Sequence, residues 1–191
     1  MLTIKNYNDA VVDYFQSFFE NTVWGAPNEA FKNAAMREES KDKVQLPLIS
    51  VYRTEIGLDT RNFALFKRGH ITNISANKIE RERVLPLVLS YQADIWASNS
   101  DQCTQLFSEV LFRTIDKPLV PVHFDGIEEK LDANLVLLDI VDNSDTSQIS
   151  TRGRLYRYTI VYQMNAHIVK IVENDRINIV PEFFTYDGRE I

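Results

Sequence analysis

Side-chain type alternates with a period of two over residues 84–97. Large apolar or aromatic side chains occupy every second position: Leu85, Leu87, Leu89, Tyr91, Ala93 and Ile95. The positions between them are Pro86, Val88, Ser90, Gln92, Asp94 and Trp96. A period of two places the two sets on opposite faces of a β-strand. The sequence therefore predicts a strand with one buried face and one half-hydrated face.

A helix is predicted directly after this strand. Ser98 and Asp101 have the spacing of a capping box, with Asp in place of the usual Glu, and Pro118 ends the pattern. The apolar stripe of this helix consists of Cys103, Leu106, Phe107, Val110, Leu111 and Thr114. We expect that stripe to pack on the apolar face of the preceding strand.

Further strands are predicted over residues 46–53, 119–124, 135–141 and 155–172, and the last is so long that it must bend or protrude. An amphipathic first helix is indicated by Tyr7, Val11, Tyr14, Phe15, Phe18 and Phe19, and a second short helix follows Pro27. This order predicts an α+β fold, namely a mostly antiparallel sheet with one central helix packed on it, plus N-terminal helices and a C-terminal extended tail.

The chain of 191 residues fits one domain. We expect a single α+β domain over residues 1–172, in which residues 1–43 form the N-terminal helical segment. Residues 54–78 are too long and too weakly patterned for a tight turn and are predicted to form a long loop or arm. Residues 173–191 are predicted to be an extended tail with aromatic anchors.

Charge and cysteine content exclude several classes of protein. The formal net charge is −6, without a basic stripe, which argues against a protein that binds nucleic acid by neutralising phosphates. Cys103 is the single cysteine, so no intramolecular disulfide is expected. The first residues lack the pattern of a signal peptide and no apolar run is long enough to span a membrane, so we expect a soluble protein made in a cytoplasm.

No spacing in the sequence indicates catalysis, a metal or a cofactor, and we expect none. His70, His123 and His167 lie in separate segments without a second ligand nearby. Cys103 is predicted to be a small buried apolar residue rather than a nucleophile, because no histidine partner is identifiable. If the chain were instead a small cytoplasmic enzyme or ligand-binding domain, its candidate residues would be Cys103, His123 and Asp94.

Aromatic residues make up 11% of the chain, more than one core of this size can hide. Large rigid rings are typical of interfaces. We therefore take Trp96 as a candidate interface anchor, with a half-covered structural tryptophan as the alternative. The remaining interface candidates lie in the predicted loop and in the tail: Phe63, Phe66, Phe183, Phe184 and Tyr186.

Residues 87–112, LVLSYQADIWASNSDQCTQLFSEVLF, resemble the central unit of the tail terminator (tail completion) proteins of long-tailed bacteriophages. In that family a strand enters a helix through a short acidic cap, an earlier strand precedes a long insertion, and a later long strand completes the sheet. Here the resemblance covers roughly residues 44–172. The order of elements is most similar to that of the proteins that cap the tube and sheath of contractile tails.

The resemblance implies a structural virion protein, assembled in the host cytoplasm, that forms a ring at the head-proximal end of the tail. Such rings are usually hexamers of one chain. They end growth of the tail tube and hold the last ring of the sheath, and they present a surface to the head-side connector protein. DNA would pass through the lumen without specific binding, and no membrane is involved. The other reading within structural proteins is a different neck, tube or baseplate component of a phage or phage-like contractile machine.

Overall fold

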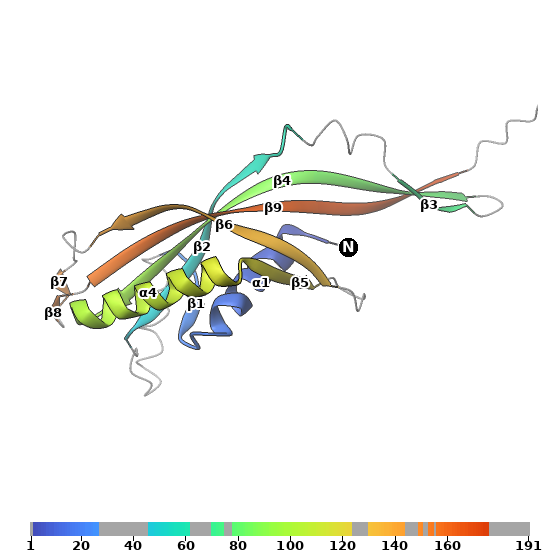
Figure 1. The fold of residues 1–191 in the computed structure, drawn as a ribbon. Coiled ribbons are helices and arrows are strands. Elements are labelled where there is room, and N and C mark those ends of the chain that lie inside the picture. Colours follow the sequence, from blue (N-terminus) through green and yellow to red (C-terminus); the bar gives the residue numbers. More distant parts are fainter. Residues whose placement is uncertain are drawn as a thin grey trace, which may run out of the picture.

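The computed structural model describes residues 2–26, 46–61, 70–74, 78–123, 130–143, 149–150, 153–154 and 156–175. Its helices are α1 (Ile4–Gln16) and α4 (Ser100–Asp116). Its strands are β1 (Thr22–Trp24), β2 (Leu48–Leu58), β3 (His70–Ile74), β4 (Lys78–Ala97), β5 (Leu119–His123), β6 (Lys130–Asp142), β7 (Ile149–Ser150), β8 (Gly153–Arg154) and β9 (Tyr156–Asp175). Figure 1 shows their arrangement.

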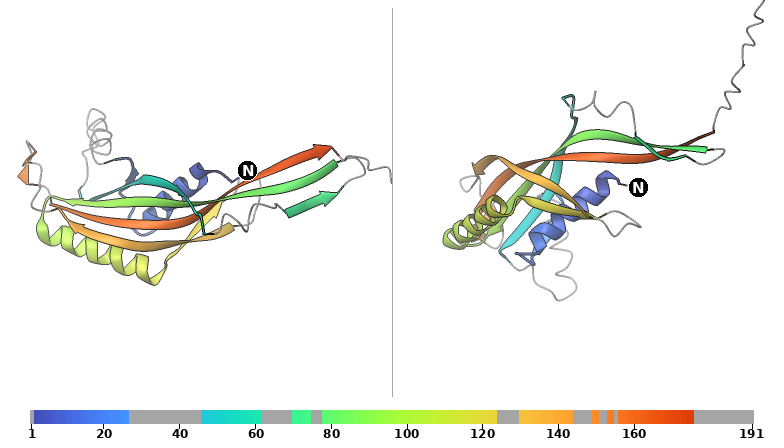
Figure 2. Two further views of the ribbon diagram at one scale, coloured as in Figure 1. Left: turned by 90° about the horizontal axis from the view of Figure 1, so that it is seen from above. Right: turned by 45° about the vertical axis from the view of Figure 1, so that its right-hand side comes forward.

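One sheet dominates the described part of the chain. Six of its strands follow the order β1-β2-β4-β9-β6-β5, and β3 pairs with β4 beside this path. The pair β1–β2 is parallel, whereas β2–β4, β4–β9, β9–β6 and β6–β5 are antiparallel. The sheet curls into a half-barrel (Figure 2). The short strands β7 and β8 pair with each other in a separate hairpin.

The central pair, β4 and β9, is longer than its neighbours. The two strands pair along their whole length, from Lys78 opposite Asp175 to Ala97 opposite Tyr156. On either side, β2 pairs with residues 87–96 of β4, and β6 pairs with residues 158–164 of β9. Residues 78–86 and 167–175 therefore project beyond the body as a ribbon flanked by β3, which we call the β4–β9 ribbon (Figures 1 and 2). The prediction that the last strand protrudes is confirmed.

Both helices pack on the same face of the sheet, where the apolar set of β4 lies. Cys103 of α4 donates a hydrogen bond to the Ile95 carbonyl at 3.6 Å, and the ring of Phe15 in α1 lies 5.8 Å from that of Tyr162 in β9. Most of the alternating residues of β4 are buried as predicted, namely Leu87, Leu89, Tyr91, Ala93 and Ile95, whereas Leu85, at the start of the set, is 37% exposed. The buried stripe of α4, which includes Cys103 and Val110, is confirmed as well.

The predicted cap of the central helix is wrong by one residue. Asn99, not Ser98, is the N-cap of α4, and its side-chain oxygen accepts a hydrogen bond from the Asp101 backbone N–H at 2.8 Å. Asn and Ser satisfy the first free N–H groups of a helix equally well, so composition alone did not separate them. The helix still begins and ends close to the predicted positions.

The predicted fold class, with one central helix on the sheet and N-terminal helices added outside it, is wrong. The sheet curls around two helices, and α1 belongs to the same core as α4. Tyr7, Val11 and Phe15 are fully buried, and the Tyr7 hydroxyl accepts from the His167 N–H at 2.8 Å. The periodicity of α1 shows which face is apolar, but not which surface that face covers. The predicted second helix after Pro27 lies outside the described residues.

The predicted loop or arm over residues 54–78 is also wrong where the structure describes it. Residues 54–58 continue β2 past a bulge between Arg53 and Glu55, β3 occupies His70–Ile74, and β4 begins at Lys78. Pairing with β4 supplies hydrogen bonds to a segment whose own alternation is weak. Of the predicted tail, residues 173–175 are the end of β9, and residues 176–191 lie outside the described part.

Candidate functional site

Of the predicted interface residues, Trp96 is the one that the structure describes, and it is not at the surface. It is 3% exposed, and its indole N–H donates to the Ser50 hydroxyl at 3.2 Å. The prediction of an interface anchor at this position is therefore wrong, because the side chain is already packed within its own chain. The other predicted interface residues lie outside the described part of the chain: Phe63, Phe66, Phe183, Phe184 and Tyr186.

Trp96 belongs to a buried polar cluster on the face of the sheet opposite the helices. The side chain of Asp94 is fully buried, and one of its oxygens lies 2.9 Å from a guanidinium nitrogen of Arg157. Its other oxygen accepts hydrogen bonds from Thr159 at 2.6 Å and from Gln92 at 3.0 Å. The Arg157 guanidinium lies 4.8 Å from the centre of the Trp96 ring. Both carboxylate oxygens are engaged, so this cluster ties β4 to β9.

The residues of the enzymatic alternative do not converge. Cys103 is buried as predicted, and burial raises the pKa of its thiol to about 11, so the thiol is protonated at neutral pH. Asp94 points to the opposite face of the sheet, and His123 is exposed at the end of β5. Within the described residues no group of three or more His, Cys, Asp or Glu side chains is arranged to hold a metal ion. No described helix is long and apolar enough to cross a membrane.

The exposed large apolar side chains of the described residues come from two sides of the strand order. One set, which we call the α4–β6 flank, comes from α4, the start of β5 and both faces of β6: Phe112, Ile115, Leu119, Val136, Leu138, Ile140 and Val141. The side chain of Phe112 is 76% exposed and that of Ile115 is 61% exposed. Single exposed apolar residues are common, but grouped ones usually mark an interaction surface.

The second flank, the β1–β2 flank, lies at the other end of the strand order. It presents Trp24, Ile56 and Leu58, and Leu85 lies on the same face as Leu58, two residues from its partner Leu87. Leu58 is 57% exposed and Trp24 is 40% exposed. Sequence reasoning missed both flanks. A helical Phe112 outside the apolar stripe of α4 was the one available signal, because an apolar residue on the wrong face has no place in the core.

Among the described strands, each flank also carries an open sheet edge. On one side β5 covers only residues 130–134 of β6, and on the other β1 covers only residues 49–51 of β2. Residues 136–142 of β6 and 52–58 of β2 therefore pair with one strand each among the described strands. An uncovered edge presents main-chain N–H and C=O groups that another strand can bind.

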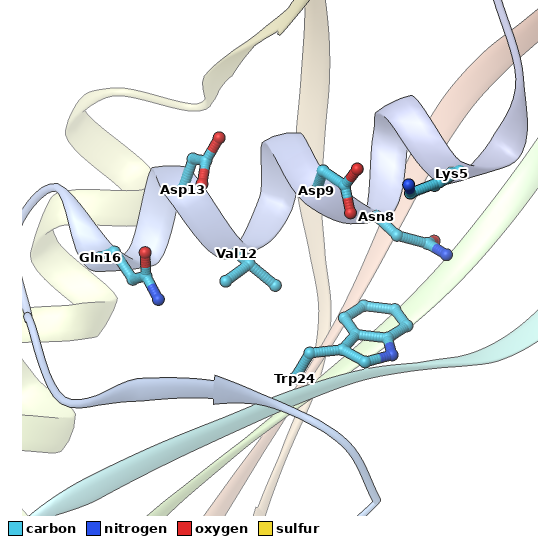
Figure 3. A pocket seen from close by; sticks show the side chains of 7 residues that line it. All are labelled: Lys5, Asn8, Asp9, Val12, Asp13, Gln16 and Trp24. Carbon is cyan, nitrogen blue, oxygen red and sulfur yellow. The ribbon is translucent and has the colours of Figure 1, made fainter.

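A groove of about 470 Å³ lies on the β1–β2 flank between α1 and Trp24 (Figure 3). It is lined by Lys5, Asn8, Asp9, Val12, Asp13, Gln16 and Trp24. Two carboxylates and one ammonium give it a slightly acidic rim, and the indole of Trp24 forms one wall. Such a wall accepts apolar or cationic side chains. The groove thus adds a concave element to a flank that is already apolar.

Comparison with known proteins adds no family to this description. No protein-family model matches the chain, and no curated protein matches it significantly in sequence.

Proposed function

We propose that this chain is a structural protein that assembles head to tail into a closed ring, and that the ring is the tail terminator of a long-tailed bacteriophage. The observation that carries the first part is the division of the exposed apolar side chains between two flanks at opposite ends of the strand order. Surfaces rich in aromatic and large apolar side chains are typical of the buried centre of an interface.

Two different flanks favour a ring over a two-fold dimer. In a two-fold dimer the same patch is used by both copies, so a single patch is sufficient. Here the α4–β6 flank of one copy and the β1–β2 flank of the next would both be covered by one heterologous contact. When the rotation between copies is a whole fraction of a turn, such a contact closes into a ring and leaves neither flank exposed.

The second part of the proposal rests on the resemblance of residues 87–112 to tail terminators. Six copies would cap the head-proximal end of the tail tube, hold the last sheath ring in a contractile tail and present a surface to the head-side connector. The β4–β9 ribbon projects from the body (Figure 2), and in this arrangement it would contact a neighbouring ring. The net charge of −6 suits a lumen that DNA crosses without binding.

The test is to mix the purified protein with tail tubes that lack heads and to image the mixture by electron microscopy. We expect one ring at one end of each tube, and loss of that ring in a Leu58→Lys, Leu138→Lys double variant, since both positions are exposed. Tubes that stay bare with the unmodified protein would overturn the terminator assignment. Rings at the opposite end or along the tube would instead assign the chain to a baseplate or tube component.

A further inference from the structure

The two open edges run in opposite directions within one sheet. Strand β2 is antiparallel to β4, β4 is antiparallel to β9, and β9 is antiparallel to β6. Three antiparallel steps leave β2 and β6 antiparallel to each other. Through the paired registers, the open stretch of β2 lies level with residues 87–92 of β4, and that of β6 lies level with residues 90–95. A second copy placed beside the first by rotation about an axis tilted from the strands is displaced along them, and a displacement of three residues (90 against 87) brings the two open edges together as an antiparallel pair.

The faces of the two edges also match. Ile56 and Leu58 pair with Leu89 and Leu87, so they lie on the face that carries the helices. On β6, Ile140 pairs with the buried Ile160 and lies on that same face. The pairing that we consider places the helix faces of the two edges on the same side of the joined sheet. Exposed apolar side chains of one edge would therefore meet those of the other, which removes both from water.

We propose that residues 52–58 of β2 in one copy add, as an antiparallel strand, to residues 136–142 of β6 in the next copy. The sheet would then run without interruption from subunit to subunit around the ring. This inference rests on the proposed ring and names the strands that close it. A second copy is the occupant because the chain itself supplies both edges, in the directions and on the faces that the pairing needs. Main-chain hydrogen bonds between edges provide affinity in this mode of recognition.

Disulfide cross-linking tests the pairing directly. Glu55 and Asp139 are both exposed and both lie on the face away from the helices, opposite Ser90 and Val161. Side chains directly opposite in an antiparallel pair have Cβ atoms about 4.5–5.5 Å apart, which mild oxidation can bridge after a small adjustment. Because the register is not fixed, Glu55→Cys is combined in turn with Asp139→Cys and with Val141→Cys. The native Cys103 is buried and does not compete.

We expect one of these double variants to give a ladder of covalent multimers on non-reducing gels, up to the full ring. Each single-cysteine variant should give dimers at most, because a ladder needs two linked sites per chain. Ile56→Lys should lower the mass of the assembly in solution, whereas Gln105→Lys, also at an exposed position but on α4, should not. Thermal melting of each variant shows whether the monomer is still folded.

The possible failures are distinguishable. A ring that forms normally, is not cross-linked by any of the cysteine pairs and still forms with Ile56→Lys would overturn the edge pairing and leave the proposed ring intact. A protein that never assembles, alone or on tail tubes, would overturn both. A ladder in the double variants that is absent from both single variants would establish the pairing.

Discussion

The carboxylate of Asp94 lies 2.9 Å from a guanidinium nitrogen of Arg157, on the face of the sheet away from both helices. The two residues are 63 positions apart, and they join β4 to β9 at the end of the sheet near α4. A buried carboxylate that loses its cation is left uncompensated, which usually destabilises a protein strongly.

Arg157→Ala is therefore expected to lower the free energy of unfolding by about 3 kcal/mol. The matched control is Arg113→Ala, since Arg113 lies 3.9 Å from Glu109 but both side chains are about half exposed. The control should change stability by less than about 0.5 kcal/mol. Urea unfolding of both variants measures the difference, and equal effects would show that the Asp94 pair is not a stabilising contact.

Helix α1 is expected to be essential to the fold rather than an appended segment. Phe15 is fully buried against Tyr162, so Phe15→Ala should lower the free energy of unfolding by about 3–5 kcal/mol. Phe112 is 76% exposed, and Phe112→Ala should leave the stability of the monomer within about 0.5 kcal/mol of the unmodified protein. A Phe15→Ala variant as stable as Phe112→Ala would contradict the shared core.

These two phenylalanines illustrate how far sequence reasoning reaches in this fold. Periodicity identified the apolar faces of β4 and α4 because each repeats over many residues. It did not show that α1 shares their core, since the contact between Phe15 and Tyr162 joins segments far apart in the chain. The short strands β1 and β3 span three and five residues, too few for an alternation to be recognised.

Stability is expected to fall in mildly alkaline solution. Burial raises the pKa of the Cys103 thiol from 9.0 to about 11, so the unfolded chain loses this proton at lower pH than the folded one. The contribution is complete below pH 9 and is lost as pH rises through 11, at up to about 1.4 kcal/mol per pH unit. Tyr14, whose pKa burial raises from 10.0 to about 12, adds the same trend only above pH 10.

Cys103→Ala isolates this effect. The variant should be less stable at every pH because it leaves a small cavity. Its free energy of unfolding should, however, change less between about pH 8.5 and about pH 10, because in this window the thiol ionises in the unfolded chain (pKa 9.0) but stays protonated in the folded one (pKa about 11). Denaturant unfolding at several pH values in that window gives both slopes. Parallel slopes for the two proteins would show that the thiol is not the titrating group.

The fluorescence of the two tryptophans should differ in its sensitivity to iodide and to assembly. Trp24 is 40% exposed and Trp96 is 3% exposed, so Trp96→Phe leaves only the surface indole as a fluorophore. In dilute solution its emission should be quenched by iodide, and assembly should protect it, because Trp24 lies on the β1–β2 flank. Trp24→Phe should leave an emission that iodide barely affects. Quenching of Trp24 that is unchanged by assembly would remove this residue from the interface.

The positions of these tryptophans show why residue patterns did not predict the candidate site. Trp96 lies on the strand face that also carries Asp94, and Arg157 from β9 completes a closed cluster there. The register that places Trp96 opposite Arg157 is a property of the β4–β9 pairing, which residue patterns do not specify. The open sheet edges of the two flanks are also a result of strand pairing, because β1 covers only part of β2 and β5 covers only part of β6.

The measurement that tests the central claim most directly is the mass of the purified protein by light scattering over a range of concentrations. A single chain has a mass of 22.1 kDa. The account predicts a mass that rises with concentration to a fixed multiple of this value, and a return toward 22.1 kDa in the Leu58→Lys, Leu138→Lys variant. A mass of 22.1 kDa at every concentration, together with tail tubes that stay bare in the mixing experiment, would contradict the proposed assembly.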